Sequence, residues 1–116
     1  GGTRTASITG GFVALKQCID ILKDKRIIKT NPIKNYVAAI SCGVLSGDVL
    51  VDLDYQEDSN AEVDANFVMN EKSEIIELQM TGEKTTCSEE QLANMLEFSK
   101  QSIQLLIKKQ KEILGA

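Results

Sequence analysis

Residues 36–55 have the sequence YVAAISCGVLSGDVLVDLDY, which is typical of two β-strands joined by a tight turn. The two apolar runs are Tyr36 to Val44 and Val49 to Tyr55, and Gly47 between them suits a hairpin turn. In the second run apolar residues alternate with Leu50 and two aspartates, so one face is apolar and the other is increasingly acidic. The segment therefore predicts an antiparallel hairpin in the middle of the chain.

Two further strands are expected downstream of this hairpin. They cover Ala65 to Met69 and Glu74 to Met80, and the polar residues 70–73 form the turn between them. Strands joined by short connections favour antiparallel pairing, so we expect a four-stranded antiparallel meander.

Helical patterns lie on both sides of the strands. Five apolar residues are spaced alternately four and three positions apart, as on one buried helical face: Ile8, Phe12, Leu15, Ile19 and Leu22. A second helix begins with a capping box, Ser88 and Gln91, and runs to Leu114, where Gly115 can end it. At about 1.5 Å per residue it is nearly 40 Å long, so part of its apolar face is expected to meet another chain. The predicted fold class is α+β, with the order helix, four strands, helix.

Composition limits the chain to one globular domain. Its 116 residues are 42% hydrophobic and 26% charged, which is too apolar for a disordered tail. No apolar run approaches the roughly 20 residues of a membrane-spanning helix, so we expect no membrane partner. A net charge of −4 and a pI of about 4.8 argue against nonspecific coating of nucleic acid.

Cysteine and histidine content narrows the chemistry further. The three cysteines are far apart, no CxxC pair is present, and the chain has no histidine, which excludes a zinc site and histidine catalysis. An odd number of cysteines indicates free thiols in a reducing compartment, so we expect a cytoplasmic protein. The first residues, Gly1-Gly2-Thr3, are not those of a secretory signal.

Charge is distributed unevenly along the chain. Residues 1–34 contain seven basic and two acidic side chains, whereas residues 35–116 contain six lysines and fifteen acids. Between Asp48 and Asp64 there are seven acids and no basic residue. The first part is suited to attract phosphate, and the second is suited to attract a divalent cation.

The segment Gly1-Gly2-Thr3-Arg4-Thr5-Ala6-Ser7 lies directly before and inside the first turn of the first helix. Small residues let an anion approach the backbone, free N–H groups point at it, and Arg4 can add a bidentate contact. This pattern predicts a phosphate site. The alternative is a flexible glycine end followed by ordinary N-capping by Thr3 or Thr5.

Residues 52–64 form an acidic connection between two predicted strands. The ends of this connection are expected to lie close together, so that Asp58 and Asp64 converge. Magnesium takes hard oxygen ligands and often only one or two protein carboxylates, which this pair can supply. The alternative is a solvated turn whose charges prevent aggregation of a sheet edge.

Four strings of residues together resemble bacterial RNase PH. They are GGTRTASITG at 1–10, KTNPI at 29–33, DLDYQEDS at 52–59 and AEVDAN at 61–66. The resemblance covers essentially the whole chain, in the same order and at the same intervals, but corresponds only to the C-terminal half of such an enzyme. It implies the second half of the RNase PH fold, which is similar to domain 2 of ribosomal protein S5, with the N-terminal half absent from residues 1–116.

The resemblance also implies an activity and its site. It implies a phosphate-dependent 3′ to 5′ exoribonuclease, a nucleotidyltransferase that trims the 3′ ends of tRNA precursors and processes rRNA by phosphorolysis, releasing nucleoside diphosphates. Carried over by position, Gly2, Thr3 and Arg4 match the phosphate-binding segment, with inorganic phosphate as co-substrate. Asp58 and Asp64 match the acidic pair that supports Mg²⁺. Arg4 and the two aspartates are thus the expected catalytic residues.

The expected partners follow from the same resemblance. They are RNA, including the 3′ end of a tRNA precursor, the N-terminal half of the same enzyme, and further copies in a homo-hexamer built as a trimer of dimers. The isolated chain is expected to be inactive because the other half supplies another phosphate-contacting arginine and much of the RNA surface. Ala65 stands where the family commonly has Met, and Phe67 where it has Val. The alternative functions are a noncatalytic ring subunit and a purely structural half-domain.

Overall fold

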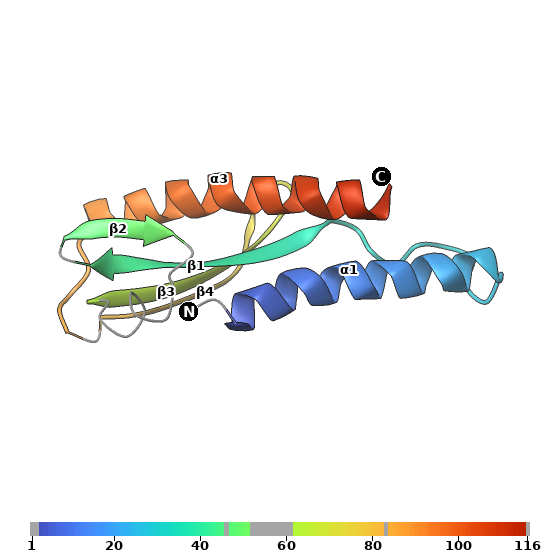
Figure 1. Cartoon of the computed structure of the whole chain (residues 1–116), viewed down its shortest axis with the longest axis horizontal. Coiled ribbons are helices and arrows are strands. Elements are labelled where there is room, and N and C mark those ends of the chain that lie inside the picture. The colour runs from blue at the N-terminus through green and yellow to red at the C-terminus, as the bar shows by residue number, and fades with distance from the viewer. Residues whose placement is uncertain (1–2, 46, 52–61, 83, 116) are drawn as a thin grey trace.

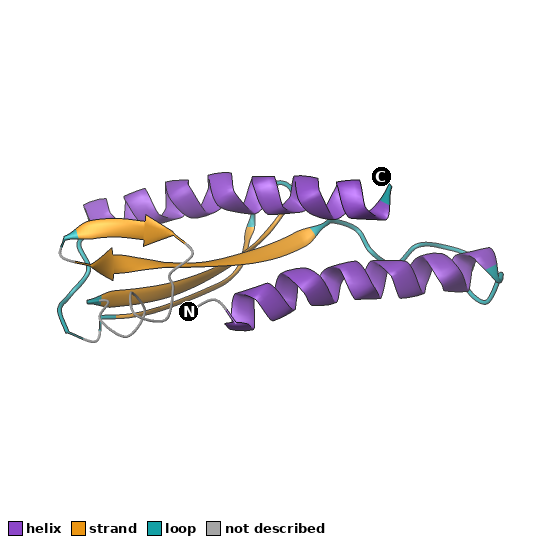
Figure 2. Ribbon diagram, in the orientation of Figure 1, coloured by secondary structure: helices purple, strands orange, loops and turns teal. Residues whose placement is uncertain are grey.

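The structure is a computed structural model that describes residues 3–45, 47–51, 62–82 and 84–115. The elements follow the order α1 (Thr3–Asp24), β1 (Val37–Leu45), β2 (Asp48–Val51), β3 (Val63–Asn70), β4 (Ile75–Thr81) and α3 (Glu89–Leu114). The four strands form one antiparallel sheet, with α3 along one face and α1 along the other (Figures 1 and 2). The predicted α+β class and element order are confirmed.

The order of the strands in the sheet is β2-β1-β3-β4, so the predicted meander is wrong. The first strand is central and pairs with both β2 and β3. Its seven inner residues are all buried, because α3 covers one face of it and α1 the other. A strand covered on both faces has no polar face, and this explains why residues 37–45 are apolar or small without alternation.

The hydrophobic core lies between α3 and the sheet. Its buried residues come from alternate positions of β1 and β3 and from one face of α3: Ala38, Ile40, Cys42, Val44, Val63, Ala65, Phe67, Met69, Met95, Ile103 and Ile107. Alternate strand residues point to opposite faces, so the intervening residues of β1 and β3 face α1. This parity places Asp64 on the α1 face.

The predicted caps of α3 are both present. Ser88 Oγ accepts a hydrogen bond from the Gln91 N–H at 3.1 Å, and Gln91 Oε1 accepts one from the Ser88 N–H at 3.0 Å. Gly115 ends the helix in the left-handed conformation, with φ 73°. Phe98 and Leu105 of α3 are 47% and 65% exposed. Neither described helix is long and apolar enough to cross a membrane.

The first helix differs from its prediction in both length and burial. It begins at Thr3, five residues before Ile8, so the small and hydroxyl-bearing residues that follow Gly2 are already helical. The predicted face is only half-buried, and Leu15 is 52% exposed. The reason is visible in Figure 1, where the second half of α1 extends beyond the end of the sheet.

Two polar side chains attach α1 to the sheet and to α3. Thr9 Oγ1 accepts a hydrogen bond from the Ala39 N–H at 3.1 Å and donates one to the Ala39 carbonyl at 3.3 Å. The buried amide of Gln110 on α3 donates to the carbonyls of Thr9 and Val37, at 3.0 and 2.9 Å. These bonds fix the position of α1 along β1, and hence the position of its N-terminus.

The turn between β3 and β4 is bound to α3 by a charged contact. Glu71 accepts hydrogen bonds from Lys111 Nζ at 3.0 Å and from the Tyr36 N–H at 3.1 Å. These two bonds lower the pKa of the Glu71 carboxyl below its ordinary value. Lys111 Nζ also lies 5.1 Å from the centre of the Tyr36 ring, which in turn contacts Phe12 of α1. Both helices and the sheet therefore meet at this end of the molecule.

Candidate functional site

The α1 face of the sheet is polar near one end. Asp64 is the register partner of Gly43 in β1 and of Thr81 in β4, and partners across an antiparallel sheet point to the same face. In β4 the polar residues Glu77, Gln79 and Thr81 alternate with apolar residues, which places all three on the face that carries Asp64. Asp64 is half-buried there.

The N-terminus of α1 points toward the end of the sheet that contains Asp64. Along the helix, Phe12 contacts Tyr36 and Thr9 is bound to Ala39, so α1 runs antiparallel to β1. The first turn of α1 therefore lies over the face that carries Asp64, where its Arg4 contacts Glu77 of β4. The N–H groups of a first helical turn have no partner within the helix and carry the positive end of its dipole.

Arg4 lies in this first turn and is bound to β4. Its Nη2 atom is 2.5 Å from Oε1 of Glu77, and the two side chains are 50% and 45% exposed. Sequence reasoning missed Glu77, although its alternation with Ile76 and Leu78 marks it as belonging to the polar face of β4. The guanidinium thus contacts a carboxylate of the sheet.

The structure places some of the predicted site residues and leaves others outside the described residues. Arg4 and Asp64 lie on one face of one sheet. Thr3 is the first residue of α1, and only its backbone is described. Gly2 and Asp58 lie outside the described residues, so their predicted roles stay predictions.

The donor chemistry of Asp64 fits a magnesium ion. Its carboxylate is a hard oxygen donor on a half-buried face, where an ion can keep several waters. Among the described residues no group of three or more His, Cys, Asp or Glu side chains converges on one point.

One buried polar atom lies on the same face. Ser41 is 1% exposed, and its Oγ atom has no hydrogen-bond partner in the part of the chain that the structure describes. It is the register partner of Asn66 on β3, two positions from Asp64. The polar surface that begins with Asp64 thus extends beneath α1 to the middle of the sheet.

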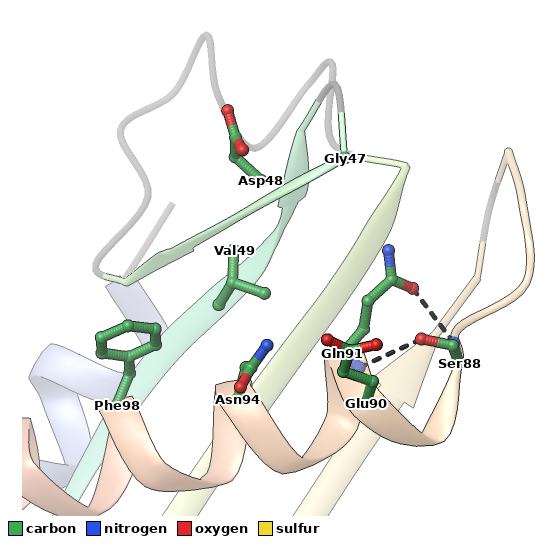
Figure 3. Close-up of a pocket in the computed structure, with 8 residues that line it drawn as sticks. All are labelled: Gly47, Asp48, Val49, Ser88, Glu90, Gln91, Asn94 and Phe98. Carbon is green, nitrogen blue, oxygen red and sulfur yellow. Dashed lines mark hydrogen bonds between the residues drawn. The ribbon is translucent and has the colours of Figure 1, made fainter.

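A separate cavity of about 640 Å³ lies between α3 and the β1–β2 turn (Figure 3). Its lining includes Asp48, Glu90, Asn94 and Phe98. The capping box satisfies two of the N–H groups of the helix N-terminus there, and the charged groups in the cavity lining are acidic, so this cavity is unsuited to phosphate. Neither Arg4 nor Asp64 lines it.

The cysteines provide no nucleophile at the polar face. Cys42 is buried, and its burial raises the thiol pKa to about 11. Cys18 is exposed on α1 and Cys87 is partly buried near the start of α3; none of the three forms a disulfide. The predicted free thiols are confirmed, although only one of them is in the core.

Comparison with known proteins gives the family of this chain. The profile of the "3′ exoribonuclease family, domain 2" matches residues 35–102. Ribonuclease PH from Methylobacterium nodulans is 46% identical over 115 residues, which are 99% of this chain and 48% of that protein. The chain therefore spans about half the length of this relative.

Two solved structures have the same fold at low sequence identity. The archaeal exosome core aligns with a TM-score of 0.61 and 18% identity, over 69% of this chain and 32% of that one. The Archaeoglobus fulgidus exosome with RNA bound to the active site aligns with a TM-score of 0.59 and 16% identity, over 73% and 35%. The sheet, its two helices and the matched sequence agree: this chain belongs to the 3′ exoribonuclease family, as the RNase PH C-terminal domain.

Proposed function

We propose that this chain is the phosphate- and metal-binding half of a phosphate-dependent 3′ to 5′ exoribonuclease that trims the 3′ ends of tRNA precursors. The observation that carries the proposal is the position of Arg4 and the N-terminus of α1 on the same sheet face as Asp64. Inorganic phosphate and the RNA phosphodiester are both anions, and a cationic helix end attracts them. A divalent cation needs oxygen ligands, and a carboxylate on the same surface supplies them. The similarity to a ribonuclease PH supports the reaction class.

Phosphate binding is the role assigned to Gly2, Thr3 and Arg4. In phosphorolysis an oxygen of inorganic phosphate attacks the phosphorus of the last phosphodiester, the bond to the 3′ oxygen breaks, and a nucleoside diphosphate leaves. Both reacting groups are anions, so bringing them together is costly. The first-turn N–H groups and the Arg4 guanidinium lower that cost by placing positive charge beside the nucleophile.

Metal binding is the role assigned to Asp58 and Asp64. A magnesium ion held there supplies positive charge to the scissile phosphate and the leaving 3′ oxygen. The residues of the sheet hold Asp64 at a fixed position, because its neighbours on β3 are buried in the core. A fixed carboxylate loses little freedom when it binds an ion.

The remaining half of the enzyme and the ring are further parts of the proposal. On edge strand β4, Ile76 and Leu78 are 57% and 40% exposed, and on α3 Leu105 is 65% exposed. Exposed apolar side chains on an unpaired edge and on a long helix are typical of surfaces that another domain or subunit covers. We assign these surfaces to the N-terminal half and to neighbouring copies in a homo-hexamer.

The reaction product tests the proposal directly. The complete protein is incubated with an RNA that carries a 3′ extension, with magnesium, in the presence and absence of phosphate. We expect shortening from the 3′ end only with phosphate, and nucleoside diphosphates as the product. Nucleoside monophosphates, or shortening at the same rate without phosphate, would show a hydrolase. Binding of RNA without any shortening would show the noncatalytic subunit.

Substitution of Asp64 tests the metal assignment. Asp64→Asn keeps the size of the side chain and removes its charge, so magnesium should bind more weakly. Loss of a residue that only supports a metal ligand lowers metal affinity by roughly 10- to 100-fold. We expect the magnesium concentration for half-maximal activity to rise by at least this factor. The measurement is a magnesium titration of the RNA-shortening rate at saturating phosphate.

Asp48→Asn serves as the control for Asp64→Asn, because Asp48 lies in β2 and lines the separate cavity beside α3. An unchanged magnesium requirement in Asp64→Asn would remove Asp64 from the proposed site. An equal rise in both variants would indicate only a general loss of negative charge.

A further inference from the structure

The contact between Arg4 and Glu77 gives the proposed phosphate site a competitor within the protein. Glu77 Oε1 accepts a charge-assisted hydrogen bond from Arg4 Nη2. Both side chains are about half exposed, so a solute anion can reach the pair. Carboxylate and phosphate oxygens use the same guanidinium N–H donors, and a donor bound to one is not available to the other.

The contact between Arg4 and Glu77 lies at a different level of the sheet from Asp64. Glu77 is paired with Val68, whereas Asp64 is paired with Thr81, four positions further along β4. Four residues of a strand span about 13 Å. In the structure, the Arg4 side chain is therefore directed at a point on the sheet well removed from Asp64. Arg4 lies in the first turn of α1, and a change of its side-chain rotamer would move the guanidinium without moving the helix.

We infer that Glu77 is the resting partner of Arg4 and that phosphate must displace it, so that Glu77 sets the phosphate concentration at which the site fills. This inference rests on the proposed function, since it takes Arg4 as a phosphate ligand. Glu77 acts through Arg4 and is a positioning residue. An exchange of this kind keeps the guanidinium paired in both states and makes phosphate binding weaker than an unpaired arginine would allow.

Glu77→Gln tests the inference, because glutamine keeps the shape of the side chain and removes the charge that competes with phosphate. We expect the KM for phosphate to fall about two- to fivefold, which is the range of an exposed ion pair, while kcat at saturating phosphate stays the same. The measurement is the rate of RNA shortening by the complete protein against phosphate concentration, with phosphate binding followed in parallel by titration calorimetry. Glu97→Gln, on α3 at the opposite face of the sheet, is the matched control and should change neither value.

A double-variant cycle separates exchange from other effects. In an Arg4→Ala background, Glu77→Gln should no longer change the phosphate KM or the calorimetric affinity, because the competition acts through Arg4. An equal fall in both backgrounds would indicate general electrostatic repulsion and overturn the inference. A rise in the phosphate KM of the single variant would overturn it as well, because Glu77 would then orient Arg4 for phosphate.

The cycle also distinguishes failure of this inference from failure of the proposed function. If Arg4→Ala alone leaves phosphate binding unchanged, the assignment of Arg4 is wrong, and the inference falls with it. If Arg4→Ala weakens phosphate binding but Glu77→Gln has no effect, the phosphate site stands and only the exchange is wrong.

Discussion

Arg4→Ala in the complete protein is expected to lower kcat/KM for phosphate by about 10²–10³-fold, the cost typical of removing one preorganised donor to a developing charge. Arg4 lies in the first turn of α1, where the helix dipole already favours an anion. Arg4→Ala removes the guanidinium from the phosphate site and leaves the backbone N–H groups in place. The residual activity should therefore remain dependent on phosphate. The measurement is the rate of nucleoside diphosphate release against phosphate concentration at saturating RNA.

The control for Arg4→Ala is Lys25→Ala. Lys25 is exposed just beyond the other end of α1, so this variant removes the same charge from a remote position. Its phosphate dependence should match that of the unmodified protein. Arg4→Lys should recover only part of the activity, because an ammonium group keeps the charge but lacks the planar pair of donors. A kcat/KM for phosphate unchanged in Arg4→Ala would contradict the assignment.

The two chemical halves of the candidate site could be predicted from the sequence because each depends on a local pattern. A small-residue segment before a helix predicts an anion site, and an acidic connection between strands predicts a cation site. Glu77 could not be predicted to contact Arg4 in the same way. The two residues are 73 positions apart, and the pair forms only because β3 pairs with β4 while α1 lies against the same face.

The fold shows the same division between local and long-range information. The caps of α3, the turn at 70–73, the start of β2 and the approximate bounds of β1, β3 and β4 follow from neighbouring residues, and the structure confirms them. The strand order does not, because it depends on which strand is covered on both faces. In retrospect the unbroken apolar character of residues 37–45 favours a central position for β1, since a meander would have placed that strand at an edge.

The half-buried state of α1 is also a long-range property. Its apolar spacing predicts a buried face, but the sheet is shorter than the helix, and only the first half of α1 lies over it. Gln110 reaches from α3 to the Thr9 carbonyl and fixes how far the helix N-terminus extends along β1. The geometry of the candidate site thus depends on a buried amide 101 positions away in the sequence.

Phe67→Ala is expected to reduce the free energy of unfolding by about 3–5 kcal/mol, the usual cost of truncating a large buried aromatic side chain. Phe67 is fully buried on the α3 face of β3, so the truncation leaves a cavity in the core and does not touch the face that carries Asp64. The measurement is the midpoint of urea or thermal unfolding of the complete protein. Phe98→Ala, the same substitution at a side chain that is 47% exposed, is the matched control and should cost much less.

The neighbour of Phe67 in the core gives a sharper form of this prediction. Ala65 and Phe67 point to the same face of β3, and both are buried. The family resemblance implies Met at position 65 and Val at position 67, where this chain has Ala65 and Phe67. The smaller residue at 65 and the larger one at 67 together keep the side-chain volume of the core nearly the same. Phe67→Val alone should destabilise the protein, and adding Ala65→Met should restore much of the loss, because volume-conserving changes cost less than about 1.5 kcal/mol. If the double variant is no more stable than Phe67→Val, the two residues do not fill a shared space, and the compensation is wrong.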